Sequence, residues 1–221
     1  LPIYNKPMIF YPIETLVRAG IREIMLVTGG RNAGDFLRLL GNGEDFDLKA
    51  VHYAYQKGEG GIAEALELAR HFVGNERHVV ILGDNIIEDD IGEFVKAFAK
   101  QKNGAKILLK EVEDAERFGV AEIEKGRVVR IVEKPKRPKT RLAVTGIYMY
   151  DEQVFGIIDT LKRSERGELE ITDVNNAYIE RGQLTYELLS GFWSDAGTFE
   201  SLLRANMLVA EKLGKLKGVH A

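Results

Sequence analysis

The chain has 221 residues, 31 Lys and Arg against 34 Asp and Glu, a formal net charge of −3 and no Cys. The slight acidic excess argues against nucleic-acid and membrane-surface binding, which favour a basic excess. The absence of Cys excludes disulfide scaffolds, thiolate metal sites and cysteine nucleophiles, and it fits a reducing cytoplasm. No run of about 18 apolar residues occurs, so no transmembrane helix is predicted.

Short β-like runs alternate with helical stretches through the first hundred residues, a pattern that favours an α/β fold. Gly20 follows the first helical stretch and is a typical residue for ending a helix. The expected elements of this half are a helix over 8–19, a strand over 23–28, a helix over 35–40, a strand over 48–55, a helix over 62–72, a strand over 78–82 and a helix over 91–101.

From residue 105 the pattern becomes mostly β-like. Strands are expected over 105–111, 120–124, 127–133, 142–150 and 184–189, and helices over 173–181 and 198–213. We therefore predict a doubly wound, mostly parallel Rossmann-like sheet with helices on both faces and antiparallel strands added in the second half. Because no repeat or long linker divides the chain, residues 1–221 are expected to form one domain.

Two aspartates are candidates for binding a divalent cation. Asp84 follows the apolar strand at 79–82, and Asp195 lies between a short β-like segment and a helix. Ligands of doubly wound sheets bind beyond the carboxyl ends of the strands, and Mg²⁺ prefers carboxylate and phosphate oxygens. Alternatively, Asp84 is a turn residue and Asp195 a helix-capping residue. The two positions together favour a metal site more than either does alone.

Lys134 directly follows the strand at 127–133, where its charge could bind a phosphate; the alternative is a solvated surface charge. The glycine-rich segment 58–61 offers backbone N–H groups to an acceptor, although no Walker sequence follows it. The four His lack metal-ligand spacing, and no serine-hydrolase elbow is present. A metal, a lysine and no evident general base favour phosphoryl-type transfer, in which positioning and charge neutralisation carry the catalysis.

Six segments together resemble the sugar-nucleotide pyrophosphorylases, and among them the glucose-1-phosphate thymidylyltransferases. The resemblance runs in a consistent order over nearly the whole chain. The segments are LPIYNKPMIFYP (1–12), LGDN (82–85), VEKP (132–135), AVTGIY (143–148), RGELEITDVN (166–175) and WSDAGT (193–198).

The resemblance implies that a phosphate oxygen of glucose 1-phosphate attacks the α-phosphorus of dTTP, forming dTDP-glucose and pyrophosphate with Mg²⁺ as cofactor. It also leads us to expect a cytoplasmic homo-oligomer. Carried over position by position, the resemblance implies that Asp84 and Asp195 bind Mg²⁺ and that Lys134 binds the sugar phosphate. The implied glucose pocket consists of Gly119, Glu133, Thr145 and Glu170. Gln56 and Gly61 would recognise thymine, and Asn85 would lie beside the nucleotide or sugar. Asp84 and Lys134 would be the catalytic residues.

Two departures from the family pattern stand out. The family's G-G-x-G-T-R-L phosphate-binding loop precedes the segment that matches Leu1 and is absent here, so residues 1–221 alone are expected to be inactive. Phe118 stands where Tyr is expected before Gly119, which removes a hydroxyl near the sugar. Two other functions remain open: a uridylyltransferase on the same fold, and a non-catalytic nucleotide- or sugar-binding subunit.

Overall fold

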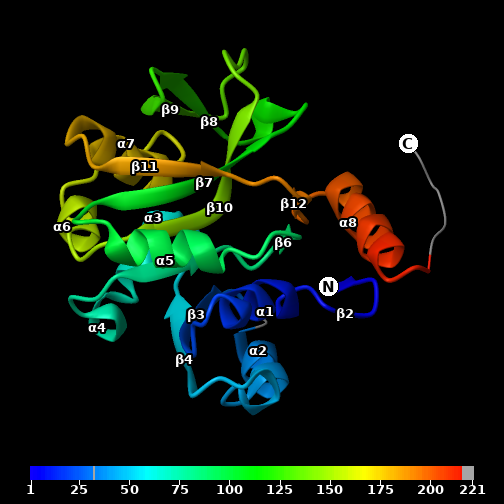
Figure 1. Cartoon of the computed structure of the whole chain (residues 1–221). Helices are drawn as coiled ribbons and strands as arrows, with labels where there is room; N and C mark the ends of the chain where they lie inside the picture. Colours follow the sequence, from blue (N-terminus) through cyan, green and yellow to red (C-terminus); the bar gives the residue numbers. More distant parts are fainter. Residues whose placement is uncertain (32, 216–221) are drawn as a thin grey trace.

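A curled mixed sheet forms the centre of the computed structural model, which describes residues 1–31 and 33–215 (Figure 1). Its strands run in the order β11-β7-β10-β8-β9, and β5 pairs with β10. The strand bounds are β5 (His78–Ile81), β7 (Ala105–Glu111), β8 (Gly119–Glu124), β9 (Arg127–Glu133), β10 (Leu142–Tyr150) and β11 (Leu184–Leu188). The predicted α/β fold and the antiparallel strands of the second half are confirmed.

The strand pairing is mixed, which corrects the expectation of a mostly parallel sheet. Strand β10 pairs antiparallel with β5, β7 and β8, and only β7 and β11 pair in parallel within this sheet. Two further strands, β3 (Glu23–Gly29) and β4 (Ala50–Gln56), form a separate parallel pair. The difference arises because β10 lies between strands from both halves of the chain and runs against each of them.

Helices cover both faces of the central sheet, as predicted. Side chains alternate along a strand, so Ile107 and Leu109 pack on one face of β7 while Leu108 packs on the other. The first face carries α3 (Ile62–Glu67), α6 (Val154–Ile158) and α7 (Ile171–Glu180). The second face carries α5 (Gly92–Lys100), whose Phe98 is buried against it.

A third apolar cluster surrounds the β3–β4 pair. Helices α1 (Phe10–Arg18) and α2 (Ala33–Leu40) contribute Ile13, Leu16 and Leu40 to it. Pro12 is accommodated because it lies in the first turn of α1, where backbone N–H groups have no partner within the helix.

The expected helix over 62–72 is divided into α3 and the short α4 (Arg70–Val73). At the division, the Ala69 N–H donates to the Leu66 carbonyl at 2.9 Å. This bond spans three positions, as in a 3₁₀ turn, instead of the four of an α-helix.

Several very short elements escaped the sequence pattern. They are β1 (Pro2–Ile3), β2 (Lys6–Pro7), β6 (Asn85–Ile87), β12 (Trp193–Asp195) and the 3₁₀ turns η1 (Glu44–Phe46) and η2 (Ala115–Arg117). Helix α8 (Phe199–Lys212) begins with a capping box in which the Thr198 hydroxyl and Ser201 cap each other's backbone N–H groups. In the part of the chain that the structure describes, no helix has the length and apolar character needed to cross a membrane.

Candidate active site

The antiparallel pair β6–β12 brings Asp84 and Asp195 together across 111 positions of sequence. Asp195 pairs with Asn85, and the Ala196 N–H donates to the Asp84 carbonyl at 2.9 Å. A Cβ atom added to Gly197 would lie 3.2 Å from Asp195 Oδ2 and 3.6 Å from Asp84 Oδ2. Both oxygens therefore face the same small space, and Gly197 leaves that space open.

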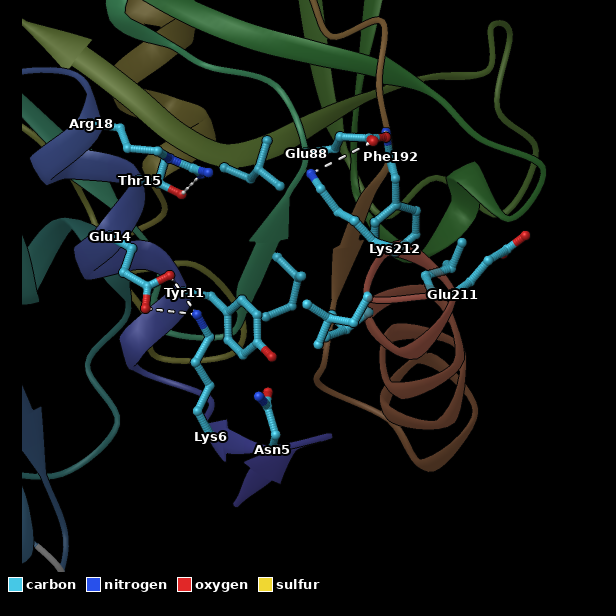
Figure 2. A pocket seen from close by; sticks show the side chains of 15 residues that line it. Asn5, Lys6, Tyr11, Glu14, Thr15, Arg18, Glu88, Phe192, Glu211 and Lys212 are labelled. Carbon is cyan, nitrogen blue, oxygen red and sulfur yellow. Dashed lines mark hydrogen bonds and ion pairs between the residues drawn. The ribbon is translucent and has the colours of Figure 1, made fainter. Parts of the chain in front are cut away.

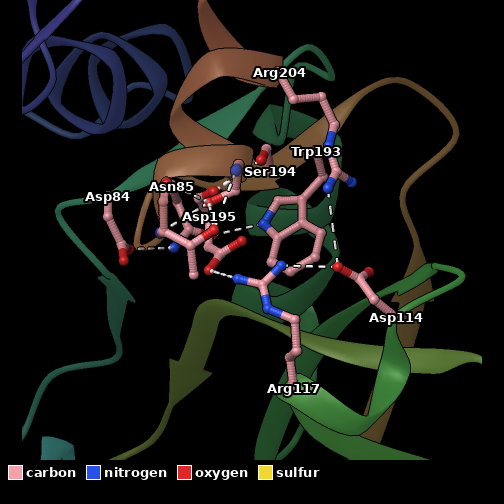
Figure 3. A network of polar contacts seen from close by, with 10 residues as sticks. Asp84, Asn85, Asp114, Arg117, Trp193, Ser194, Asp195 and Arg204 are labelled. Carbon is pink, nitrogen blue, oxygen red and sulfur yellow. Dashed lines mark hydrogen bonds and ion pairs between the residues drawn. The ribbon is translucent and has the colours of Figure 1, made fainter. Parts of the chain in front are cut away.

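Asn85 fixes the orientation of Asp84 from behind. Its side-chain N–H donates to Asp84 Oδ1 at 3.1 Å, and its oxygen accepts from the Trp193 ring N–H at 2.7 Å (Figure 3). Asn85 is only 2% exposed. A Cβ on Gly146 would come within 2.5 Å of the Asn85 amide nitrogen, so only glycine fits there. The structure thus uses the Asn85 side chain to support the carboxylate.

Arg117 is a residue of this site that the sequence reasoning missed. One guanidinium nitrogen donates to Asp195 Oδ2 at 2.7 Å, and the other donates to Asp114 Oδ2 at 2.8 Å (Figure 3). Arg204 of α8 approaches the same Asp114 oxygen at 4.0 Å. Arg117 and Asp195 are 78 positions apart, so no local spacing could have indicated the pair.

Burial raises the pKa of Asp195, the Arg117 charge opposes that rise, and the Asp84 charge adds to it. A half-buried pair of carboxylates with this electrostatic strain suits a divalent cation, which would neutralise both charges. Within residues 1–31 and 33–215, no group of three or more His, Cys, Asp or Glu side chains is gathered closely enough to hold a metal. A cation held by two carboxylates would complete its shell with water or substrate phosphates, as Mg²⁺ commonly does.

A second cluster gathers the residues expected to line a sugar pocket. Gly119 pairs with Glu133 across β8 and β9. The Thr172 hydroxyl donates to Glu133 Oε2 at 2.6 Å, and a Cβ on Gly119 would lie 3.4 Å from both of these oxygens. Glu170 accepts hydrogen bonds from Ser164 at 2.7 Å. Glu133, Glu170 and Gly119 therefore share one region, and Thr172 is an addition that the sequence reasoning missed.

Arg166 joins the carboxylates of this cluster. Its guanidinium lies 2.8 Å from Glu170, 3.4 Å from Glu168 and 3.6 Å from Glu133. It belongs to the RGELEITDVN segment, so its motif was visible in the sequence, but its role beside Glu133 was not.

Lys134 lies next to this cluster, at the end of β9. Its backbone N–H donates to the Phe118 carbonyl at 3.0 Å, and its φ of 42° turns the chain sharply after Glu133. Among the described residues, no carboxylate lies within 4.0 Å of its ammonium group. The exposed ammonium group is thus available to an external anion.

Thr145 lies in the interior of the sheet, on β10. It is fully buried, and its hydroxyl donates to the Leu108 carbonyl at 2.9 Å. The bond fills the irregularity between Val144 and Tyr148, where the register of β10 against β7 shifts. The Thr145 oxygen keeps its acceptor lone pairs while its hydrogen is donated to Leu108, so its expected contact with the sugar stays a prediction.

Gln56 and Gly61 are held together at the end of β4. The Gln56 side-chain N–H donates to the Gly61 carbonyl at 3.1 Å. Gly61 has φ 95°, and a Cβ there would come within 2.5 Å of the Leu169 carbonyl, so glycine is required. The Leu169 N–H in turn donates to Gly60 at 2.8 Å. The segment expected to read the base therefore lies against the chain that carries Glu170.

Residues 117–119 connect the two clusters. Arg117 bonds to Asp195, the Phe118 carbonyl accepts from the Lys134 N–H, and Gly119 pairs with Glu133. The metal-side and sugar-side candidates are therefore joined by direct contacts through this short segment.

A cavity of about 570 Å³ lies elsewhere, between α1, β6 and α8 (Figure 2). Charged side chains rim it, including a pair formed by Lys6 and Glu14, and Phe192 and Val209 supply apolar surface. None of the residues expected to bind substrate or metal lines it. The cavity and the candidate active site are therefore distinct features that share β6 and α8.

The nucleotidyl transferase family model matches residues 1–212. The chain belongs to this family. Its relatives include a glucose-1-phosphate thymidylyltransferase from Neisseria meningitidis, 44% identical over 95% of this chain and 74% of the relative. One from Mycolicibacterium smegmatis is 42% identical over 95% of this chain and 73% of the relative. The family resemblance inferred from the six segments is confirmed.

Two solved structures share the fold. A Bacillus anthracis protein assigned as a glucose-1-phosphate thymidylyltransferase, solved in complex with a sucrose, has a TM-score of 0.90 and 50% identity, covering 100% of this chain and 87% of that one. A UDP-glucose pyrophosphorylase complexed with UDP-glucose has a TM-score of 0.83 and 25% identity, covering 96% of this chain and 89% of that one. The family architecture therefore extends over nearly the whole chain.

Proposed function

We propose that the protein is a glucose-1-phosphate thymidylyltransferase, which forms dTDP-glucose and pyrophosphate from dTTP and glucose 1-phosphate. The observation that carries the proposal is the 50% identity to the Bacillus anthracis protein over the entire chain. Relatives with 42–44% identity over 95% of the chain carry the same activity in their names. The grouping of the candidate residues into one region is what such a two-substrate reaction requires.

The chemical obstacle is charge repulsion, because a phosphate anion must attack the phosphorus of another anion. The sugar phosphate is ionised near neutral pH and needs no general base, so charge neutralisation and alignment carry the reaction. In this proposal Lys134 binds the phosphate of glucose 1-phosphate. Glu133 and Glu170 accept hydrogen bonds from the glucose hydroxyls, and Gly119 leaves room for the ring.

The nucleotide would lie between the Gln56–Gly61 segment and the metal-side carboxylates. Gln56 would exchange its bond to Gly61 for the thymine edge, with the Gly61 backbone close to the base. Asp84 and Asp195 would hold Mg²⁺, which would offset negative charge on the triphosphate and the departing pyrophosphate. Asn85 would keep Asp84 in place beside the nucleotide.

The proposal also covers the cofactor, the oligomeric state, the cellular location and the partners of the protein. Mg²⁺ as cofactor is supported by the convergence of the two carboxylates. A homo-oligomeric state and a cytoplasmic location are expectations from the family resemblance and from the composition. Nucleic acid and membrane are not expected partners, since the chain carries a net charge of −3.

A uridylyltransferase is the second candidate, because the UDP-glucose pyrophosphorylase shares the fold. Its 25% identity is half that of the Bacillus anthracis protein, which favours dTTP. Full-length protein, expressed from the complete gene, should be assayed with glucose 1-phosphate, Mg²⁺ and either dTTP or UTP, and kcat/KM compared. A preference for dTTP is expected. A preference for UTP would assign the second function, and binding of both substrates without turnover would assign a non-catalytic subunit.

A further inference from the structure

Arg117 links Asp195 of the proposed metal site to Asp114, the residue directly before η2. Its two terminal nitrogens bond to Asp114 and Asp195, at 2.8 and 2.7 Å. Asp195 Oδ2, the oxygen that accepts this bond, is also the one that faces Asp84 across Gly197. The arginine therefore acts on the oxygen whose position matters for sharing a cation.

The Arg117 guanidinium lies over one aromatic ring, which in turn packs against a second. It lies 4.9 Å from the centre of the Phe118 ring, which packs edge-on at 5.1 Å against Trp193. Trp193 donates to Asn85, and Asn85 donates to Asp84. A chain of direct contacts thus runs from one carboxylate to the other through Arg117. Phe118 supplies only its ring to these contacts, so the hydroxyl of the expected Tyr is not needed for them.

We propose that Arg117 is a positioning residue, which holds the Asp195 carboxylate against Asp84 so that both can bind one divalent cation. The inference deepens the proposed function and rests on it. Two carboxylates that face one small space repel each other, and a guanidinium fork offsets that repulsion while fixing direction through two charge-assisted bonds. Asp114 holds the other arm of the fork, so the arginine cannot follow Asp195 if the carboxylate turns away.

The consequence is measurable as metal affinity. Partners that orient a metal ligand typically contribute about 10–100-fold to affinity. Arg117→Gln removes the charge and the fork, and it should weaken cation binding by about that factor. Arg117→Lys keeps the charge, but a single ammonium cannot bridge Asp114 and Asp195 in the same way, so it should restore only part of the loss.

The experiment is an electron paramagnetic resonance titration of free Mn²⁺ with the full-length protein, without nucleotide. Asp84→Asn and Asp195→Asn serve as reference variants that define the site. Arg38→Gln is the matched control, because Arg38 also pairs with an aspartate three residues earlier, but on the exposed helix α2. Thermal unfolding of each variant is recorded in parallel to show that it is folded.

The expected order of Mn²⁺ affinity is wild type and Arg38→Gln, then Arg117→Lys, then Arg117→Gln, then the two reference variants. Affinity of Arg117→Gln equal to or tighter than that of the wild type would overturn the positioning role while leaving the metal site intact. Wild-type affinity in Arg117→Lys would show that charge alone suffices, which also overturns it. Reference variants that bind Mn²⁺ like the wild type would overturn the proposed metal site itself.

If Arg117→Gln does not fold, Asp114→Asn tests the proposal instead. This variant keeps the arginine and its contact with Phe118. It removes the charge that tethers the second arm, so Mn²⁺ affinity should fall by several-fold, less than for the arginine variants. Unchanged affinity in a folded Asp114→Asn protein would contradict the tethering that the proposal requires.

Discussion

The metal side and the sugar side of the candidate site both set an arginine against carboxylates, but they are built differently. Arg117 is 27% exposed, bonded to two aspartates and supported by Phe118. Arg166 is 42% exposed and donates to both Glu170 oxygens at 2.8–3.2 Å, but its contacts with Glu168 and Glu133 are longer, at 3.4 and 3.6 Å.

From this comparison we expect the metal side to be held more firmly than the sugar side. Partly buried, mutually bonded groups resist movement, while exposed ion pairs contribute about 0–1 kcal/mol and exchange readily. Losses on the metal side should therefore lower turnover at every substrate concentration. Losses on the sugar side should instead appear mainly as weaker recognition of glucose 1-phosphate.

The largest effect is expected from Asp195→Asn in the full-length protein. Removing one preorganised charged group from an active site typically costs about 10²–10³ in rate, so kcat should fall by at least that factor. Steady-state pyrophosphate release at saturating dTTP, glucose 1-phosphate and Mg²⁺ measures it. Asp35→Asn, on the exposed face of α2, is the control and should retain full turnover. A kcat within threefold of the wild-type value would show that Asp195 is not needed for the reaction.

Lys134→Ala should produce the next largest effect, because a charged hydrogen bond to phosphate contributes about 1.5–3 kcal/mol. The expected loss in kcat/KM for glucose 1-phosphate is about 10–100-fold at 1.4 kcal/mol per factor of ten. Initial rates over a range of glucose 1-phosphate concentrations give this value. Lys136→Ala, which removes an exposed lysine close to Lys134 in the sequence, should change kcat/KM for glucose 1-phosphate little. Equal losses in the two variants would mean that general positive charge matters, rather than Lys134.

Gln56→Ala should weaken dTTP binding by about 1–3 kcal/mol, the cost of leaving a buried polar edge unpaired. Recognition of glucose 1-phosphate should be unchanged, since Gln56 contacts Gly61 and Glu64 rather than the sugar-side carboxylates. Isothermal titration with dTTP measures the first quantity, and Lys57→Ala is the neighbouring control. Unaltered dTTP affinity would exclude Gln56 from the base contact.

The smallest expected effect is on the free energy of unfolding, and it comes from His78, which is not one of the metal-side or sugar-side residues. Burial lowers the pKa of His78, although the Glu76 carbonyl and the Asp151 charge oppose the shift. Its ring stacks on Phe155, and its Nε2 is buried without a hydrogen-bond partner among the described residues. In the unfolded chain His78 takes up a proton near pH 6.5, whereas in the folded chain its lowered pKa keeps it neutral to a lower pH. The contribution of neutral His78 to the free energy of unfolding is therefore complete above about pH 6.5 and is lost as the pH falls below it.

His78→Phe keeps an aromatic ring and removes the titrating group, so its unfolding free energy should depend less on pH between about 7.5 and 5. The difference in slope is at most about 1.4 kcal/mol per pH unit. Urea unfolding at several pH values measures it, with the exposed His52→Gln as control. A slope identical to that of the wild type would show that His78 titrates alike in both states.

The sequence predicted the elements that have a strong internal pattern. The bounds of β7, β9 and β10 agree with the expected strands, because seven to nine residues of apolar or alternating character leave little ambiguity. It did not predict β6, whose three residues carry no periodicity, and it indicated β12 only as a short β-like segment before Asp195. Their pairing nevertheless brings Asp84 and Asp195 together, so the expectation of convergence came from strand-end position and family resemblance.

Contacts over long sequence distances account for most of what was missed in the site. Arg117 and Thr172 reach Asp195 and Glu133 across 78 and 39 positions, and no local spacing encodes such pairs. Thr145 shows a further contact that no local spacing encodes. Its hydroxyl donates to the Leu108 carbonyl at the irregularity of β10, and its place in the glucose pocket stays a prediction.

Transfer of the nucleotidyl group to glucose 1-phosphate is tested most directly by following the phosphorus atoms of dTTP. Full-length protein with Mg²⁺ and glucose 1-phosphate should be given dTTP labelled at either the α- or the γ-phosphate. The α-label is predicted to appear in dTDP-glucose and the γ-label in pyrophosphate, in equal amounts, with neither product formed by Asp195→Asn. Release of the γ-label as inorganic phosphate, or retention of both labels in dTTP while glucose 1-phosphate binds, would contradict it.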